Sequence, residues 1–161
     1  MAFPRLSDIQ PCHGSIELKK IALILLFAIA CRPQAGMPVT GAPTARAAVE
    51  QFLAAVRAQD LQAMSAIWGN EKGPAREQYP LNEVEQRELL MQCYFSHDSF
   101  RILGQVDGEN ARKVFTVELK KGALTRTTTF SVVEGPRNRW YLDNGNIEPV
   151  KDFCRPNRNA R

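Results

Sequence analysis

The spacing of apolar residues changes once along this chain, and that change constrains the fold more than any other feature. From Thr44 to about Tyr94 apolar residues recur every three to four positions, as in helices that bury one face. After Tyr94 they alternate with polar residues, as in strands that bury one face. Helices followed by a run of strands predict an α+β domain, with the helices packed on one face of an antiparallel sheet.

Three helices are predicted in the first half of the folded region. The first is expected over 44–58, with its initial threonine as the N-cap. Its apolar face carries Val49, Phe52, Leu53 and Val56. The second begins after a capping Asp60 and ends at Gly69, and a polar loop follows. Asn82 is expected to cap a third helix that ends near Cys93. The residues expected to be buried on this helix are Val84, Leu89, Leu90 and Cys93.

Four strands and a short extended segment are predicted in the second half. The first strand lies around 100–102, the second over 113–121, and a long threonine-rich third over 124–134. Alternation places one set of second-strand residues on a common face: Lys113, Phe115, Val117, Leu119 and Lys121. The fourth strand is expected at 140–142, and a last extended segment at Ile147. The strands follow one another through short turns, which predicts a meander.

An export signal precedes the folded region. Lys19 and Lys20 are followed by an unbroken apolar run over 21–30 and then by Cys31. A hydrocarbon core takes roughly 17–25 helical residues to cross, so this run is too short for a permanent span. The segment resembles a bacterial lipoprotein signal, whose cysteine is acylated after cleavage, and ordinary secretion is the alternative. Either translation begins near Leu18, or the first residues form an extended n-region.

The signal implies a domain organisation and a location. Residues 1–30, an N-terminal extension plus signal peptide, are expected to be removed, and 31–43, rich in proline, glycine and small residues, to be a flexible tether. A single α+β domain is expected over 44–154, followed by a basic tail over 155–161. The resemblance places the protein in the bacterial cell envelope, lipid-anchored at Cys31 and facing outside the cytoplasm.

The cysteines and the charge limit the possible partners. After removal of Cys12 and lipidation of Cys31, only Cys93 and Cys154 remain, and an oxidising compartment favours a disulfide between them over two buried thiols. Two cysteines and His97 are too few for a structural zinc site, so no metal is predicted. The net charge is +4, with the signs interspersed and no clustered basic stripe, so nucleic acid binding is not expected.

The order of elements resembles the nuclear transport factor 2-like superfamily. The likeness rests on the helical pattern from Val49 to Trp68 and on the late run of Trp140, Tyr141 and Leu142. It implies a cone-like domain in which helices close a curved antiparallel sheet over a cavity. Catalytic members, such as ketosteroid isomerase and the polyketide cyclases, place an Asp base and a polar partner in that cavity.

The residues that could line such a pocket lie near the helix-to-strand junction and on the later strands: Tyr94, Asp98, Arg126 and Trp140. Arg126 could bind an acidic ligand, pair with Asp98, or lie at a sheet end in water. His97 and Asp98 are neighbours on an extended segment, so their side chains are expected to point to opposite faces. Asp98 is expected to bond local backbone. No catalytic residue and no cofactor are therefore predicted.

Three functions follow from these observations. The first is a non-enzymatic envelope lipoprotein whose cone domain binds a small apolar ligand or an envelope protein. The second is an isomerase- or cyclase-like enzyme that uses the cavity for proton transfer. The third is a structural interaction module with a filled core. A deep cavity with convergent ionisable groups favours the enzyme, an apolar cavity favours ligand binding, and a filled interior favours the interaction module.

Overall fold

The structure is a computed structural model that describes residues 40–154. The predicted signal, the predicted lipidation site Cys31 and the predicted basic tail over 155–161 lie outside the described residues. Within them, helices and an antiparallel sheet confirm the predicted α+β class.

The first two predicted helices are confirmed. Helix α2 spans Ala45–Ala58, and the backbone N–H of Ala47 donates to Oγ1 of its N-cap Thr44 at 3.1 Å. Helix α3 spans Leu61–Ile67, with Asp60 as its N-cap. The predicted apolar face of α2 is wholly inside the core.

The third helix differs from the prediction at its start and in its buried face. Helix α4 spans Leu81–Tyr94 and begins after Pro80, with no side-chain cap, so the predicted cap at Asn82 is wrong. Val84 is buried as expected, whereas Leu89 and Leu90 are 52% and 57% exposed. Successive side chains on a helix are rotated by about 100°, so the positions that share the inward face with Val84 lie four and then seven residues further along. Leu89 and Leu90 fall between these positions and therefore point outward.

The loop between the second and third helices has its own structure. A small hairpin forms from β1 (Gly69–Asn70) and β2 (Gly73–Pro74), and the one-turn helix η1 (Ala75–Glu77) follows it. Strand β1 contacts β5 and β6, so this segment packs against that side of the large sheet.

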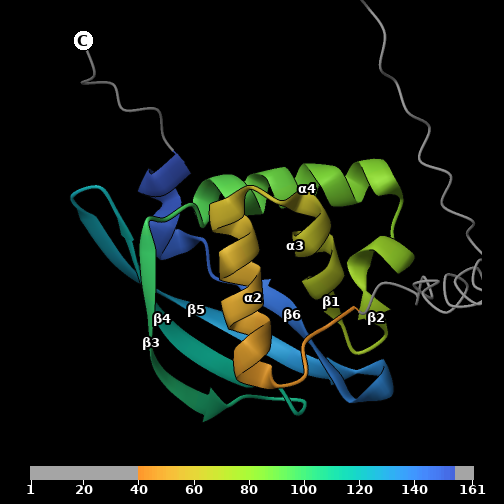
Figure 1. Ribbon diagram of the computed structural model, residues 1–161. Coiled ribbons are helices and arrows are strands. Elements are labelled where there is room, and N and C mark those ends of the chain that lie inside the picture. The colour runs from red at the N-terminus through yellow and green to blue at the C-terminus, as the bar shows by residue number, and fades with distance from the viewer. Residues whose placement is uncertain (1–39, 155–161) are drawn as a thin grey trace, which may run out of the picture. The chain divides into compact units, whose positions relative to one another are not determined.

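The second half forms a four-stranded antiparallel meander, as predicted. The strands are β3 (Ser99–Asp107), β4 (Lys113–Lys121), β5 (Leu124–Gly135) and β6 (Arg139–Gly145), in that order across the sheet. The one-turn helix η2 (Pro136–Asn138) joins the last two strands. Strand β3 is interrupted by a bulge between Ile102 and Gly104. Figure 1 shows the helices gathered over one face of this curved sheet.

The core lies between the helices and the inner face of the sheet. The predicted alternation along β4 is confirmed, because Phe115, Val117 and Leu119 are at most 1% exposed. They belong to one buried cluster with apolar residues of α2, α3, β5, β6 and the C-terminal segment.

Both ends of the domain differ from the prediction. Gly41 and Ala42 were assigned to the tether, yet Ala42 pairs with Trp140 through two backbone hydrogen bonds and is fully buried. After β6, Ile147 belongs to no strand, and the chain then forms a helical segment, η3 (Glu148–Cys154), which was not predicted. Val150 and Phe153 of η3 enter the core, which explains why this segment turns back on the domain.

Candidate functional site

The inner face of the sheet, where the superfamily resemblance implies a cavity, is filled by aromatic rings. Phe52 of α2, Phe95 after α4 and Phe130 of β5 contact one another, with ring centroids 4.8–6.2 Å apart. All three side chains are at most 1% exposed. A Cβ atom added at Gly145 would lie 2.6 Å from Cζ of Phe95, so the Phe95 ring occupies the space that this glycine leaves. The centre of the inner face is therefore packed as a core.

The turn end of the inner face is covered by η3. Arg126 and Lys121 point to this face, and each meets a residue of η3. Nη2 of Arg126 donates to Oδ2 of Asp152 at 2.5 Å. Nζ of Lys121 donates to the backbone oxygen of Phe153 at 2.6 Å and to Oγ of Ser96 at 2.5 Å. Charged groups that a ligand would meet in an open cone are therefore paired within the chain.

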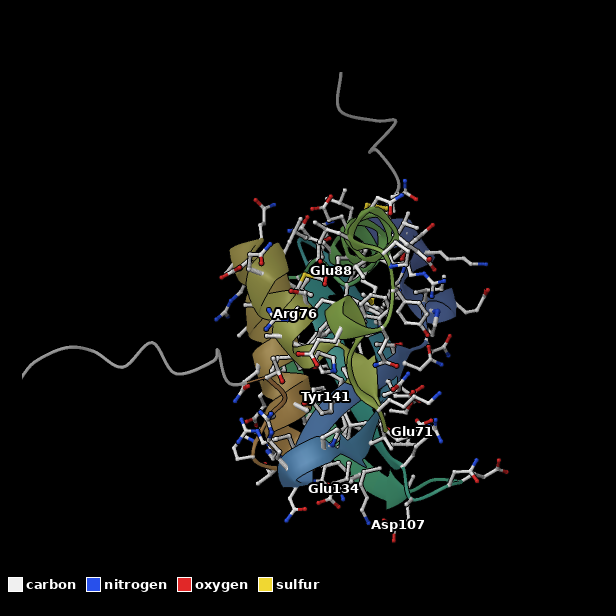
Figure 2. All side chains as sticks on the ribbon, turned by 90° about the vertical axis from the view of Figure 1, so that its right-hand side faces the viewer. Glu71, Arg76, Glu88, Asp107, Glu134 and Tyr141 are labelled. Atoms are coloured by element: carbon white, nitrogen blue, oxygen red, sulfur yellow. A yellow bond between two sulfur atoms is a disulfide. The ribbon has the colours of Figure 1, made fainter. Side chains whose placement is uncertain are left out.

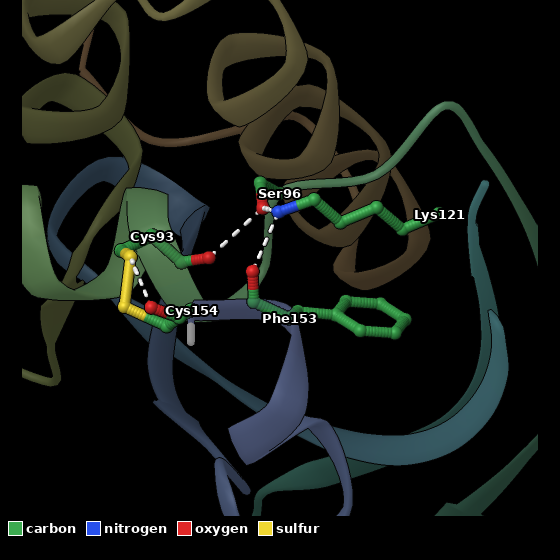
Figure 3. Close-up of a disulfide and its surroundings, with 5 residues drawn as sticks. All are labelled: Cys93, Ser96, Lys121, Phe153 and Cys154. Carbon is green, nitrogen blue, oxygen red and sulfur yellow. Dashed lines mark hydrogen bonds between the residues drawn. A yellow bond between two sulfur atoms is a disulfide. The ribbon is translucent and has the colours of Figure 1, made fainter. Parts of the chain in front are cut away.

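The predicted disulfide between Cys93 and Cys154 is confirmed. It joins the end of α4 to the end of η3 across a sequence separation of 61, with the Cα atoms 4.9 Å apart. Figure 3 shows the bridge beside the hydrogen bonds of Lys121. The disulfide and the lysine hold the same short helix from two sides.

The four predicted pocket residues do not converge on one site. Tyr94 and Trp140 are half-buried and pack against the core. Asp98 is exposed, and its Oδ2 accepts a hydrogen bond from the backbone N–H of Gly122, 2.7 Å away in the turn between β4 and β5. The expected bond to local backbone is therefore wrong, because the β4–β5 turn lies beside Asp98 in the sheet. Arg126 bonds Asp152. This partner was not predicted, because the helical course of η3 was not predicted.

His97 is buried rather than aimed into a site. It is 5% exposed, its Nδ1–H donates to the backbone oxygen of Phe95 at 2.8 Å, and its ring meets Phe100 edge to face. Burial lowers the pKa of His97 below its usual range and so favours the neutral ring. The Arg57 guanidinium acts in the same direction, whereas the hydrogen bond to Phe95 and the charge of Asp98 oppose the shift. Its Nε2 is buried without a partner in the described part of the chain. Asp98 is exposed, so the pair does not share a pocket.

Among the described residues, the carboxyl group whose pKa is shifted most is that of Glu88, which was not among the predicted site residues. It is 2% exposed on the inward face of α4, and its Oε1 has no hydrogen-bond partner in the described residues. Its pKa is raised to about 7, mainly by burial and also by the negative charge of Glu85, while the positive charge of Arg76 acts in the opposite direction. Figure 2 labels Glu88 and Arg76 on neighbouring elements. The one signal for Glu88 in the sequence was its position four residues after Val84, which places the two side chains on the same buried face of α4.

A shallow depression lies on the opposite, outer face of the sheet. Glu118 and Lys120 alternate with the buried residues of β4 and therefore face outward. They line a depression of about 190 Å³ together with residues of the paired strand β3: Ser99, Phe100 and Arg101. Nη2 of Arg101 lies 3.3 Å from Oε1 of Glu118.

Comparisons with protein-family models, with curated proteins and with solved structures find no match to this chain. Among the described residues, no helix is long and apolar enough to cross a membrane. No group of three or more His, Cys, Asp or Glu side chains in 40–154 is arranged to hold a metal ion.

Proposed function

We propose that this chain is an envelope lipoprotein, anchored through Cys31, whose cone-like domain binds another envelope protein at its surface and performs no catalysis. Anchoring is supported by the lysines, the short apolar run and the cysteine at its end. The cone-like, nuclear transport factor 2-like character of the domain is supported by its order of elements, with helices first and a four-stranded meander second.

The packed inner face of the sheet is the observation that carries this proposal. Ligand pockets are concave spaces of about 300–1,000 Å³ that bury most of their ligand. Here the corresponding space is occupied by Phe52, Phe95 and Phe130, and its turn end is covered by η3. A filled interior favours binding at the surface over enclosure of a small ligand.

The enzyme alternative has less support. Acid–base catalysis needs titratable groups within hydrogen-bond reach of one substrate. His97 is sealed against Phe95 and Phe100, and Asp98 bonds the Gly122 backbone. Glu88 is buried on the inward face of helix α4, a different element from the segment that carries His97 and Asp98.

In-cell crosslinking tests surface binding with the full chain in its own membrane. A photo-crosslinking amino acid is placed at one exposed position on each side of the domain: Gln51, Leu90, Val106 and Thr127. A protein partner predicts a discrete adduct of one mass from at least one of these positions. The same amino acid at Phe130, which is fully buried, is the control and should give no protein adduct.

Two results would contradict the proposal. One is the absence of protein adducts from all four exposed positions. The other is a small molecule that stays with the detergent-solubilised full chain in native mass spectrometry and is lost on denaturation, since that result would indicate an enclosed ligand.

A further inference from the structure

The two edges of the four-stranded sheet differ in what lies beside them. Beyond β6, Ala42 pairs with Trp140, and Trp68 forms a bridge with Leu142. Strand β3 is the other edge, and within residues 40–154 no strand pairs with its outer side. Figure 1 shows β3 at the border of the sheet. An edge strand presents unpaired backbone N–H and C=O groups, so β3 can accept one more strand.

Two apolar side chains on β3 are largely exposed to solvent. Val106 is 65% exposed and Leu103 is 48% exposed. The bulge at Leu103 divides β3 into two short segments, 99–102 and 104–107. A long, regular partner strand is therefore disfavoured, and a short one fits either segment.

The depression described above lies directly beside the first of these segments. Arg101 is paired with Glu118, which leaves Lys120 as the uncompensated charge in its lining. Lys120 is exposed and forms no ion pair within the described residues. The depression therefore carries a net positive charge and suits a carboxylate.

We propose that β3 and the depression beside it are the docking site for a short extended segment of a partner protein, which adds a strand to the sheet and places an acidic side chain opposite Ser99, where the long Lys120 side chain reaches it from the next strand. This inference rests on the proposed function and names its surface. Strand addition gains affinity from backbone hydrogen bonds and specificity from side-chain pockets. Here the edge of β3 offers the backbone groups, and the depression offers the pocket.

A second copy of this chain fits the site less well. Antiparallel pairing of two 99–102 segments, with outward side chains matched, brings the two Arg101 residues opposite or diagonal to each other. Like charges in those positions destabilise a strand pair. Lys120 lies opposite Ser99 and adds to the same repulsion. An acidic segment from a different protein avoids this cost.

Two synthetic peptides test the site on the purified full chain in detergent. Both alternate valine and threonine over seven residues, and they differ only in a central glutamate or lysine. Affinity is measured by fluorescence anisotropy, and amide hydrogen exchange of residues 99–107 reports the place of binding. We expect the glutamate peptide to bind about fivefold more tightly than the lysine peptide and to slow exchange in β3.

Variants separate this site from a general charge effect. Lys120→Glu should reverse the preference between the two peptides. Lys72→Glu makes the same change of charge in the β1–β2 hairpin, beside the opposite edge, and should leave the preference as it is. Thermal unfolding checks that both variants remain folded.

Several outcomes would overturn the inference. They are binding of neither peptide, binding without slower exchange in β3, a glutamate preference that survives Lys120→Glu, or β3 protection that rises with protein concentration alone, which would indicate a second copy. Discrete in-cell adducts from other surfaces, alongside any of these results, would keep the proposed function and reject only this site.

Discussion

Asp152 accepts a hydrogen bond from Nη2 of Arg126 at 2.5 Å, and this contact joins the C-terminal helix η3 to strand β5. The second carboxylate oxygen, Oδ1, is buried and has no partner in the described residues. The pair lies at the turn end of the inner face of the sheet, so it helps η3 to cover that end of the face. Its contribution to stability is therefore a measure of how firmly η3 is docked.

A double-mutant cycle with Arg126→Ala and Asp152→Ala should give a coupling free energy of about 0.5–1 kcal/mol. The value is modest because both side chains are somewhat more than one third exposed, at 37% and 35%, and water screens the pair. Urea unfolding of the full chain measures it. The more exposed pair of Arg46 and Glu50 on α2 is the control and should couple less strongly. Equal coupling in the two pairs would contradict a docking role.

Cys154→Ser should lower the free energy of unfolding by roughly 3–4 kcal/mol, because the bridge to Cys93 restricts a long loop in the unfolded chain. Urea unfolding without reductant measures this loss. Reduced wild-type protein should match the variant, and neither change should release the protein from the membrane. Alkylation of two free thiols in the unreduced protein would show that the bridge is absent in solution.

Glu88→Gln should stabilise the protein at pH 8 and have little effect near pH 5. The pKa of Glu88 rises from 4.5 to about 7 on folding, so the folded state holds a proton that the unfolded state releases. Its favourable contribution is complete below pH 4.5 and is lost as the pH rises through 7, a difference of roughly 3 kcal/mol. Unfolding midpoints between pH 4 and pH 8 measure it.

The exposed neighbour Glu85 provides the matched control for this measurement. Glu85→Gln removes one negative charge from the same helix without removing a buried carboxyl group, so it should change the pH dependence much less. A Glu88→Gln variant that retains the wild-type pH dependence would show that another group titrates.

Cys31→Ala should abolish partition of the protein into the detergent phase or block its processing. The proposal of a lipid anchor requires a thiol at this position, because the acyl chains are attached to it. Cys154→Ser, which leaves Cys31 intact, is the control and should partition as wild type. A water-soluble mature form of the wild type that begins at another residue would count against lipidation.

Features that depend on neighbouring residues were predictable from the sequence. Thr44 and Asp60 cap their helices because a cap needs only a backbone N–H three residues away. The buried face of β4 follows from strict alternation, and the turn at Gly122 follows from its position between two alternating runs. The disulfide was predictable for another reason: the predicted export signal accounted for Cys12 and Cys31 and implied an oxidising compartment, so Cys93 and Cys154 were expected to pair.

The sequence by itself therefore determined the fold class, the order of the three main helices and four main strands, and the pairing of Cys93 with Cys154. Only the tertiary structure decided that α4 buries Glu88 in place of Leu89, that Arg126 bonds Asp152, and that aromatic rings fill the inner face. The physical reason is the range of the interactions. Period and caps act over a few residues, whereas the partner of a side chain depends on which distant segments, such as η3, pack beside it.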